Sequence, residues 1–198
     1  MGIYGIKPLF QQRLAGVERL LARRRVHPDY LTLGALALSA AGGLMLWAAN
    51  VAHPLLLLLI PVALGRTALN VLDGLVARDT GLSRPWGEVL NEFSDVCLFA
   101  GASVAPGSDS RVGAAVTVLM LLSSYLGTAA KAAGGKREYG GVMGKADRMI
   151  YLSVACLVAV LFPFFPVFRV FLVLVGAGLA VTIVQRLRTI HHALQPAR

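Results

Sequence analysis

The apolar residues of this chain come in six blocks of about twenty, separated by short polar segments. A helix needs about 20 consecutive apolar residues to cross roughly 30 Å of hydrocarbon, and six such blocks nearly exhaust the 198 residues. Only 15% of the residues are charged, whereas about a quarter are charged in soluble domains. The sequence therefore predicts an all-α membrane protein that forms a single membrane domain over residues 1–198.

Six transmembrane helices are expected, bounded by prolines, glycines and charged turns. They cover about 30–49, 54–78, 87–105, 112–132, 146–162 and 167–185. Residues 5–25 precede them, and their apolar positions recur at spacings of three and four between basic residues. This pattern is typical of a helix that lies on an anionic membrane surface. We therefore expect an N-terminal amphipathic interfacial helix, and the alternative is a solvated basic leader.

The positions of lysine and arginine predict the orientation. The net charge of +9 is spread between the apolar blocks and forms no single basic stripe, which argues against nucleic acid as a partner. If the N-terminus is inside, sixteen of the 19 basic residues fall on cytoplasmic segments, and only Arg111 and Arg169 lie outside. Because cytoplasmic loops are rich in Lys and Arg, both termini are predicted to be cytoplasmic, in a bacterial inner membrane whose lipids surround the protein.

Ionisable and amide side chains gather in the second and third predicted spans. Arg66, Asn70 and Asp73 share one helix face in the second span, and Asn91 and Asp95 share one in the third, because residues three or four apart are neighbours on a helix. An ionisable residue inside a membrane is costly unless it faces a partner or a polar cavity. A short loop joins the two spans, so we expect the two faces to meet at the cytoplasmic side. Oxygen ligands from two helices suit Mg²⁺, Mn²⁺ or Ca²⁺.

The spacing of these residues has a known counterpart. Residues 70–95 read Asn-x-x-Asp-Gly-x-x-Ala-Arg, then eight residues, then Gly-x-x-x-Asn-x-x-x-Asp. This resembles the signature of the CDP-alcohol phosphotransferase family, in which all four acidic positions are aspartate. The positions that match in identity and spacing are Asp73, Gly74, Ala77, Arg78, Gly87 and Asp95. The predicted interfacial helix and six spans also resemble that family, so the resemblance covers nearly the whole chain.

Two of the four signature aspartates are asparagines here, Asn70 and Asn91. In the family the four carboxylates bind divalent metal, and the last, Asp95 in this chain, is assigned as the base that activates the acceptor. An amide keeps an oxygen ligand but loses the negative charge, which Glu92 or Glu88 could restore from the next residue or the preceding turn. The metal ligands that the resemblance implies, for Mg²⁺ or Mn²⁺, are Asp73, Asn70, Asn91, Asp95 and Glu92. A single-metal site and polar contacts between helices are the alternatives for the asparagines.

The resemblance implies a metal-dependent membrane transferase of phospholipid biosynthesis. An acceptor hydroxyl deprotonated by Asp95 would attack the phosphorus that carries the lipid of CDP-diacylglycerol, or of a related CDP-alcohol, and CMP would leave. The substrate-binding candidates are Gly74, Ala77, Arg78, Gly87, Arg66, Lys131, Lys145 and Arg148. Arg66 could instead pair with Asp73 or Asp95, Gly74 could be a packing glycine, and the basic residues could serve topology alone. A homodimer is expected from the resemblance only.

Other classes of function stay open at this point. A member of the same fold with altered or lost catalysis would bind a nucleotide or lipid, and the two asparagines motivate this alternative. A small transporter or channel should carry polar positions in several helices, whereas here they cluster at one side of the membrane. A structural scaffold needs no aspartate at the ends of two spans. The sequence does not indicate the acceptor alcohol.

Overall fold

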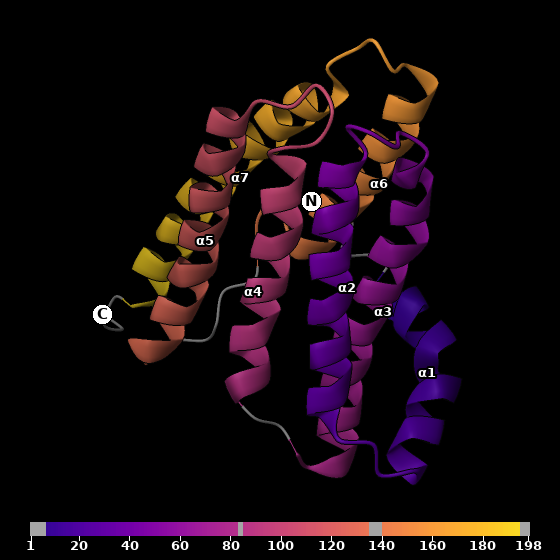
Figure 1. Ribbon diagram of the computed structural model, residues 1–198. Helices are drawn as coiled ribbons and strands as arrows, with labels where there is room; N and C mark the ends of the chain where they lie inside the picture. Colours follow the sequence, from indigo (N-terminus) through magenta and orange to yellow (C-terminus); the bar gives the residue numbers. More distant parts are fainter. Residues whose placement is uncertain (1–6, 83–84, 135–139, 195–198) are drawn as a thin grey trace.

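The computed structural model describes residues 7–82, 85–134 and 140–194, and these residues form seven helices without a strand (Figure 1). The side chains of residues 7–10, Pro85 and Glu88 lie outside this description. The helices are α1 (Lys7–Arg23), α2 (Pro28–Ala48), α3 (Leu55–Thr80), α4 (Pro85–Ala102), α5 (Ser110–Ala132), α6 (Lys145–Leu161) and α7 (Val167–Ala193). The all-α prediction is therefore confirmed for the described residues.

Four of these helices, α2, α3, α5 and α7, are long and apolar enough to cross a membrane. Helices α4 and α6 are shorter, at 18 and 17 residues, and they carry several buried or half-buried charged residues, among them Asp95 on α4 and Arg148 on α6. The chain is thus a helical protein with at least four candidate spans. The count of six spans and the interfacial position of α1 stay predictions.

Local sequence explains where several helices begin and end. Asp109 accepts hydrogen bonds from the backbone N–H groups of Arg111 and Val112 and so caps α5, as short polar side chains do at helix starts. Helix α3 ends at Gly81, whose φ of 68° is left-handed, a conformation that glycine adopts without strain. At the C-terminus the helix continues past the predicted end at residue 185 to Ala193, because glycine and proline are absent between Gly178 and Pro196.

Six helices close a ring, with α1 packed outside it along α3 (Figure 1). Helix α2 packs against both α3 and α4; α4 packs against α5, α5 against α7, α7 against α6, and α6 against α3. Helices α3 and α4, which we expected to be direct neighbours, are therefore both packed on α2 and make little helix-to-helix contact with each other. Leu14 and Leu21 of α1 cover an apolar cluster of Leu31, Leu72 and Val76 at the α2–α3 boundary.

Glycines of α2 explain why this helix can lie between α3 and α4. A methyl group at Gly43 would collide with the carbonyl oxygen of Cys97, and one at Gly101 would collide with the backbone of Gly43. Small residues let two helix backbones approach closely, so α2 and α4 cross at direct backbone contact. At Gly42 the space for a side chain is taken by Leu98 of α4 and by residues of α3.

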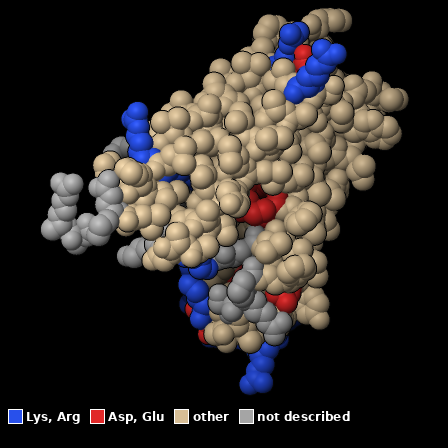
Figure 2. All heavy atoms as spheres, turned by 90° about the vertical axis from the view of Figure 1, so that its left-hand side faces the viewer, with Lys and Arg blue, Asp and Glu red and all other residues tan. Residues whose placement is uncertain are grey.

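The outer surface of the ring is mainly apolar. Figure 2 shows one face on which uncharged residues dominate, with lysine and arginine near the extremities. Large exposed side chains on the outward faces include Trp47, Leu64, Val118, Tyr125 and Leu174. An extended exposed apolar surface marks contact with a membrane or another protein, and it agrees with the apolar spans.

We expect Gly101→Ala to lower the thermal unfolding midpoint of the protein in detergent. The added methyl group meets backbone rather than a flexible side chain, and overpacking of this kind costs about 1–3 kcal/mol. The matched control is Gly65→Ala on α3, where the new Cβ would lie 3.4 Å from Leu38 Cδ1, an ordinary contact. An equal midpoint in the two variants would show that α2 and α4 do not cross at these glycines.

Candidate active site

A buried carboxylate on α4 binds two arginines from two other helices. Asp95 is 1% exposed, and its Oδ1 accepts a hydrogen bond from Nη2 of Arg66 on α3. Its Oδ2 accepts one from Nη2 of Arg148 on α6 at 2.7 Å, and Lys145 Nζ lies 3.9 Å from the same oxygen. Asp95 thus connects α3, α4 and α6 across the middle of the ring.

Arg66 is held on both sides of its guanidinium. It is 3% exposed, and its Nε donates to Ser39 Oγ of α2 at 3.2 Å. The Ser39 hydroxyl in turn donates to the carbonyl oxygen of Ala35 at 2.8 Å. Of the partners that the sequence allowed, the structure pairs Arg66 with Asp95, because a buried guanidinium needs a close anion to offset its lost hydration.

Asp73 lies on the same face of α3, two helical turns from Arg66. It is buried and accepts a hydrogen bond from Thr32 Oγ1 of α2 at 3.0 Å. Neither Thr32 nor Ser39 was identified from the sequence. They are seven residues apart and therefore share a face of α2, which is the pattern that could have indicated a polar stripe in this otherwise apolar helix.

The two asparagines of the signature are half-buried residues whose side-chain oxygens are turned away from solvent. The Oδ1 atoms of Asn70 on α3 and Asn91 on α4 are buried, and neither has a hydrogen-bond partner among the described residues. Buried polar atoms are nearly always hydrogen-bonded, so each exception needs a physical cause. Amide oxygens are ligands of Mg²⁺ and Ca²⁺ in proteins, and together with the Asp73 carboxylate these two oxygens could hold a divalent cation.

The carboxylate of Glu92, a candidate metal ligand, forms an ion pair with a lysine of α6. Its Oε1 accepts a hydrogen bond from Lys145 Nζ at 2.7 Å, with the lysine side chain 36% exposed. The side chain of Glu88 lies outside the described residues. Within the part of the chain that the structure describes, three His, Cys, Asp or Glu side chains nowhere come together as a metal cluster. Amide oxygens are therefore the further oxygen ligands to consider beside Asp73.

The small and basic residues of the signature occupy different settings. A methyl group added at Gly74 would meet nothing within 4 Å, so this glycine is not closely packed against another helix and open space adjoins it. A Cβ at Gly87 would lie 3.6 Å from Thr32 Oγ1. Ala77 is partly buried, whereas Arg78 is exposed. Lys131 is exposed in the last turn of α5.

Helix α7 positions the first turn of α6, which carries Lys145 and Arg148. Thr182 Oγ1 accepts a hydrogen bond from the backbone N–H of Met143 at 2.9 Å. Arg186 donates to the carbonyl oxygens of Gly140 and Ser123 at 2.9 and 2.5 Å. These α7 residues were also missed in the sequence, where Arg186 was interpreted only as a topology signal.

Asp147 completes this arrangement from within α6. Its Oδ2 accepts a hydrogen bond from the backbone N–H of Gly144 at 2.9 Å, which is one half of a capping box. The cap sets where α6 begins and therefore places Arg148 on the face that reaches Asp95. The basic face of α6 is thus positioned by contacts from α7 to the segment before it and by the cap of its own first turn.

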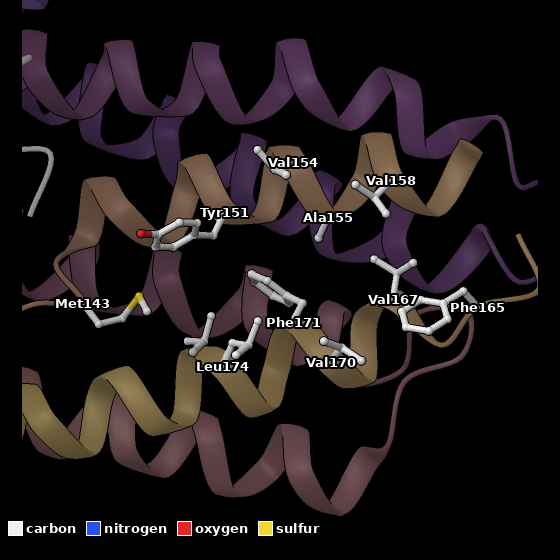
Figure 3. Close-up of a pocket in the computed structure, with 11 residues that line it drawn as sticks. Met143, Tyr151, Val154, Ala155, Val158, Phe165, Val167, Val170, Phe171 and Leu174 are labelled. Atoms are coloured by element: carbon white, nitrogen blue, oxygen red, sulfur yellow. The ribbon is translucent and has the colours of Figure 1, made fainter. Parts of the chain in front are cut away.

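A separate pocket lies between α6 and α7 (Figure 3). It is lined by Tyr151 and by apolar side chains that include Val154, Val158, Val170 and Phe171. Its lining contains no charged side chain, so the charged residues belong to the cluster around Asp95 and not to this pocket.

The chain was compared with known proteins. Residues 25–184 match the family described as CDP-alcohol phosphatidyltransferase. Inner membrane protein YnbA of Escherichia coli (strain K12) is 36% identical over 168 residues, which are 82% of this chain and 83% of that protein.

Solved structures of the Mycobacterium tuberculosis phosphatidylinositol phosphate synthase (PgsA1) share the fold. The form with CDP-DAG bound has a TM-score of 0.71 at 26% identity and covers 92% of this chain and 97% of that one. The complex with manganese and citrate has the same TM-score and identity and covers 92% of each chain. The matched family region contains the signature and the three cationic side chains around Asp95, and this chain belongs to the CDP-alcohol phosphatidyltransferase family.

Proposed function

We infer that this protein transfers a phosphatidyl group from CDP-diacylglycerol, or from a related CDP-alcohol, to the hydroxyl group of an acceptor and releases CMP. The family membership supports this reaction, and so does the neighbour solved with CDP-DAG bound. The observation in this chain that supports it best is the buried Asp95, which lies beside Arg148 and Lys145 at the end of the family signature.

We propose that Asp73, Asn70 and Asn91 hold a divalent cation for the donor. The two amide oxygens are buried without a partner among the described residues, and the open space beside Gly74 leaves room for a ligand, so these residues fit such an ion. A bound Mg²⁺ or Mn²⁺ would neutralise charge on the pyrophosphate and on the leaving CMP. The manganese complex of the structural neighbour supports a divalent metal in this fold.

Asp95 is the proposed base, and its two oxygens have different tasks. Oδ1 is occupied by the fully buried Arg66, so Oδ2 is the atom that can take the acceptor proton. Arg148 and Lys145 lie at Oδ2, and a base must face the proton that it removes. An anionic acceptor would draw these two cations toward itself and free Oδ2. The acceptor oxygen then bonds to phosphorus, its proton moves to Oδ2, and the bond from phosphorus to CMP breaks.

The basic residues Lys131, Lys145 and Arg148 are proposed to bind the acceptor, and Arg78 and Gly87 the donor. We further propose that the chain crosses the membrane six times and that α1 lies on the membrane surface. The distribution of Lys and Arg supports an orientation in which both termini and the active site are cytoplasmic. The relative that is named an inner membrane protein supports the bacterial inner membrane as the location. A homodimer is also expected from the family.

A second candidate is a family member that binds a CDP-alcohol without turning it over. Two observations favour it: the signature has only two of its four carboxylates, and one of these, Asp95, is bound by two arginines. In that case the protein would bind CDP or its lipid and release no CMP with any acceptor.

We expect the purified protein to release CMP from CDP-diacylglycerol when Mg²⁺ or Mn²⁺ and a suitable acceptor are present. The assay should use a panel of acceptors, because the chain does not reveal which alcohol is used. Chelation with EDTA should stop the release, and added Mn²⁺ should restore it. A folded protein that binds CDP but releases no CMP across the panel would support the second candidate.

Asp95→Asn should abolish CMP release and should also lower the thermal unfolding midpoint. It removes the base and leaves Arg66 and Arg148 buried without their anion, and loss of one partner from a buried pair costs about 3–5 kcal/mol. Turnover must therefore be expressed per folded protein. The stability control is Glu92→Gln, which breaks the partly exposed pair with Lys145 and should cost about 0–1 kcal/mol. Wild-type turnover by folded Asp95→Asn would remove Asp95 as the base.

Lys145→Gln should raise the KM for a phosphate-bearing acceptor by about tenfold, as expected when a charge-assisted contact of roughly 1.4 kcal/mol is lost. The KM for CDP-diacylglycerol should change much less. Arg111→Gln, an exposed substitution at the start of α5, is the matched control for loss of one positive charge. Equal KM increases for donor and acceptor would contradict an acceptor-specific role.

A further inference from the structure

We propose that the guanidinium of Arg66 is a built-in cation that takes the place of one metal ion in this site. The protein would then bind a single divalent ion per chain. The proposal rests on the function inferred above. It concerns how many metal ions that function uses, and which residue of this chain replaces the other.

The candidate ligands divide into two groups according to their contacts. Asp95 already has a cationic side chain at each carboxylate oxygen, and Glu92 is bound by Lys145. In contrast, Asn70 and Asn91 each have a buried Oδ1 without a partner among the described residues. Among the described candidate ligands, these two oxygens and the Asp73 carboxylate, which accepts from the neutral Thr32 hydroxyl, are the ones not bound to a cationic side chain. Three oxygens from two helices suit one ion that completes its shell with water or substrate.

The charge balance gives the same answer. Of the four acidic positions of the family signature, only two are carboxylates in this chain, Asp73 and Asp95. Two divalent ions would add four positive charges beside Arg66, Arg148 and Lys145, and like charges repel strongly in a site of low dielectric constant. With one ion, Asp73 faces the metal and Asp95 faces arginine, so each carboxylate has a cation of its own.

The position of Arg66 suits a permanent charge. It lies deep in α3, is 3% exposed, and is fixed by Asp95 on one side and by Ser39 on the other. Arginine stays protonated in proteins, and a covalently attached cation cannot be removed by a chelator. Arg148 and Lys145 differ because they lie on the first turn of α6, next to the partly exposed Glu92 pair.

The test is the number of Mn²⁺ ions bound by the purified full-length protein, measured by the electron paramagnetic resonance signal of free Mn²⁺ during titration. The wild type should bind one Mn²⁺ per chain. The double variant that carries Asn70→Asp and Asn91→Asp should bind that ion at least tenfold more tightly than the wild type, and it should still bind only one ion per chain. When Arg66→Met is added to this double variant, Oδ1 of Asp95 loses its cationic partner, and the triple variant should bind a second Mn²⁺ per chain.

Two further variants separate the role of Arg66 from general loss of a buried arginine. Arg186→Met in the same doubly substituted protein removes a buried cation from α7, and one Mn²⁺ should remain. Arg66→Lys keeps the charge, and one Mn²⁺ should also remain. Two ions in the wild type, or a single ion in folded protein after Arg66→Met, would overturn the proposal, and so would no Mn²⁺ binding at all.

The proposed number of metal ions and the proposed transfer reaction can be contradicted independently of each other. A protein that releases CMP but binds two ions has the proposed function without the built-in cation. One that binds a single ion, gains a second after Arg66→Met and releases no CMP has the built-in cation without the function. The two measurements therefore test separate claims.

Discussion

The structure depends on one carboxylate that is shared between two buried arginines. Apolar helix faces pack in a bilayer with little preference for one rotation over another, because lipid tails are as apolar as the helices. The contacts of Asp95 with Arg66 and Arg148 restrict that freedom, since each buried charge must meet its partner. They determine which faces of α3, α4 and α6 turn toward the middle of the ring, and the asparagines and Asp73 follow from that rotation.

The same contacts make opposite demands on Asp95. A structural tie is strongest when both oxygens are permanently occupied, whereas a base needs one oxygen free. In the proposed mechanism the two tasks fall on different oxygens: Arg66 holds Oδ1 from within α3, while Arg148 and Lys145 meet Oδ2 from the first turn of α6. That first turn is held by the Asp147 cap and by Thr182 and Arg186 of α7.

Much of this was predictable from local sequence, and the rest depended on packing between distant segments. The apolar blocks gave the helices, and spacings of three and four placed Asn70 with Asp73 and Asn91 with Asp95. The sequence did not show that α2 lies between α3 and α4, because this depends on a backbone contact of Gly43 with Gly101. Thr32 and Ser39 were missed for the same reason, because the sequence does not show that their hydroxyl groups bind Asp73 and Arg66 on another helix.

The order of the charged residues along the chain affects how the protein enters its membrane. Asp95 lies 29 residues after Arg66, and Arg148 a further 53 residues on. During synthesis α3 therefore reaches the membrane before either partner does, although an arginine at the centre of a helix opposes insertion by about 2.5–3.5 kcal/mol. The long leucine-rich start of α3 must compensate for that penalty alone. The arrival of α4 then relieves it, so the two helices have reason to enter the bilayer as a pair.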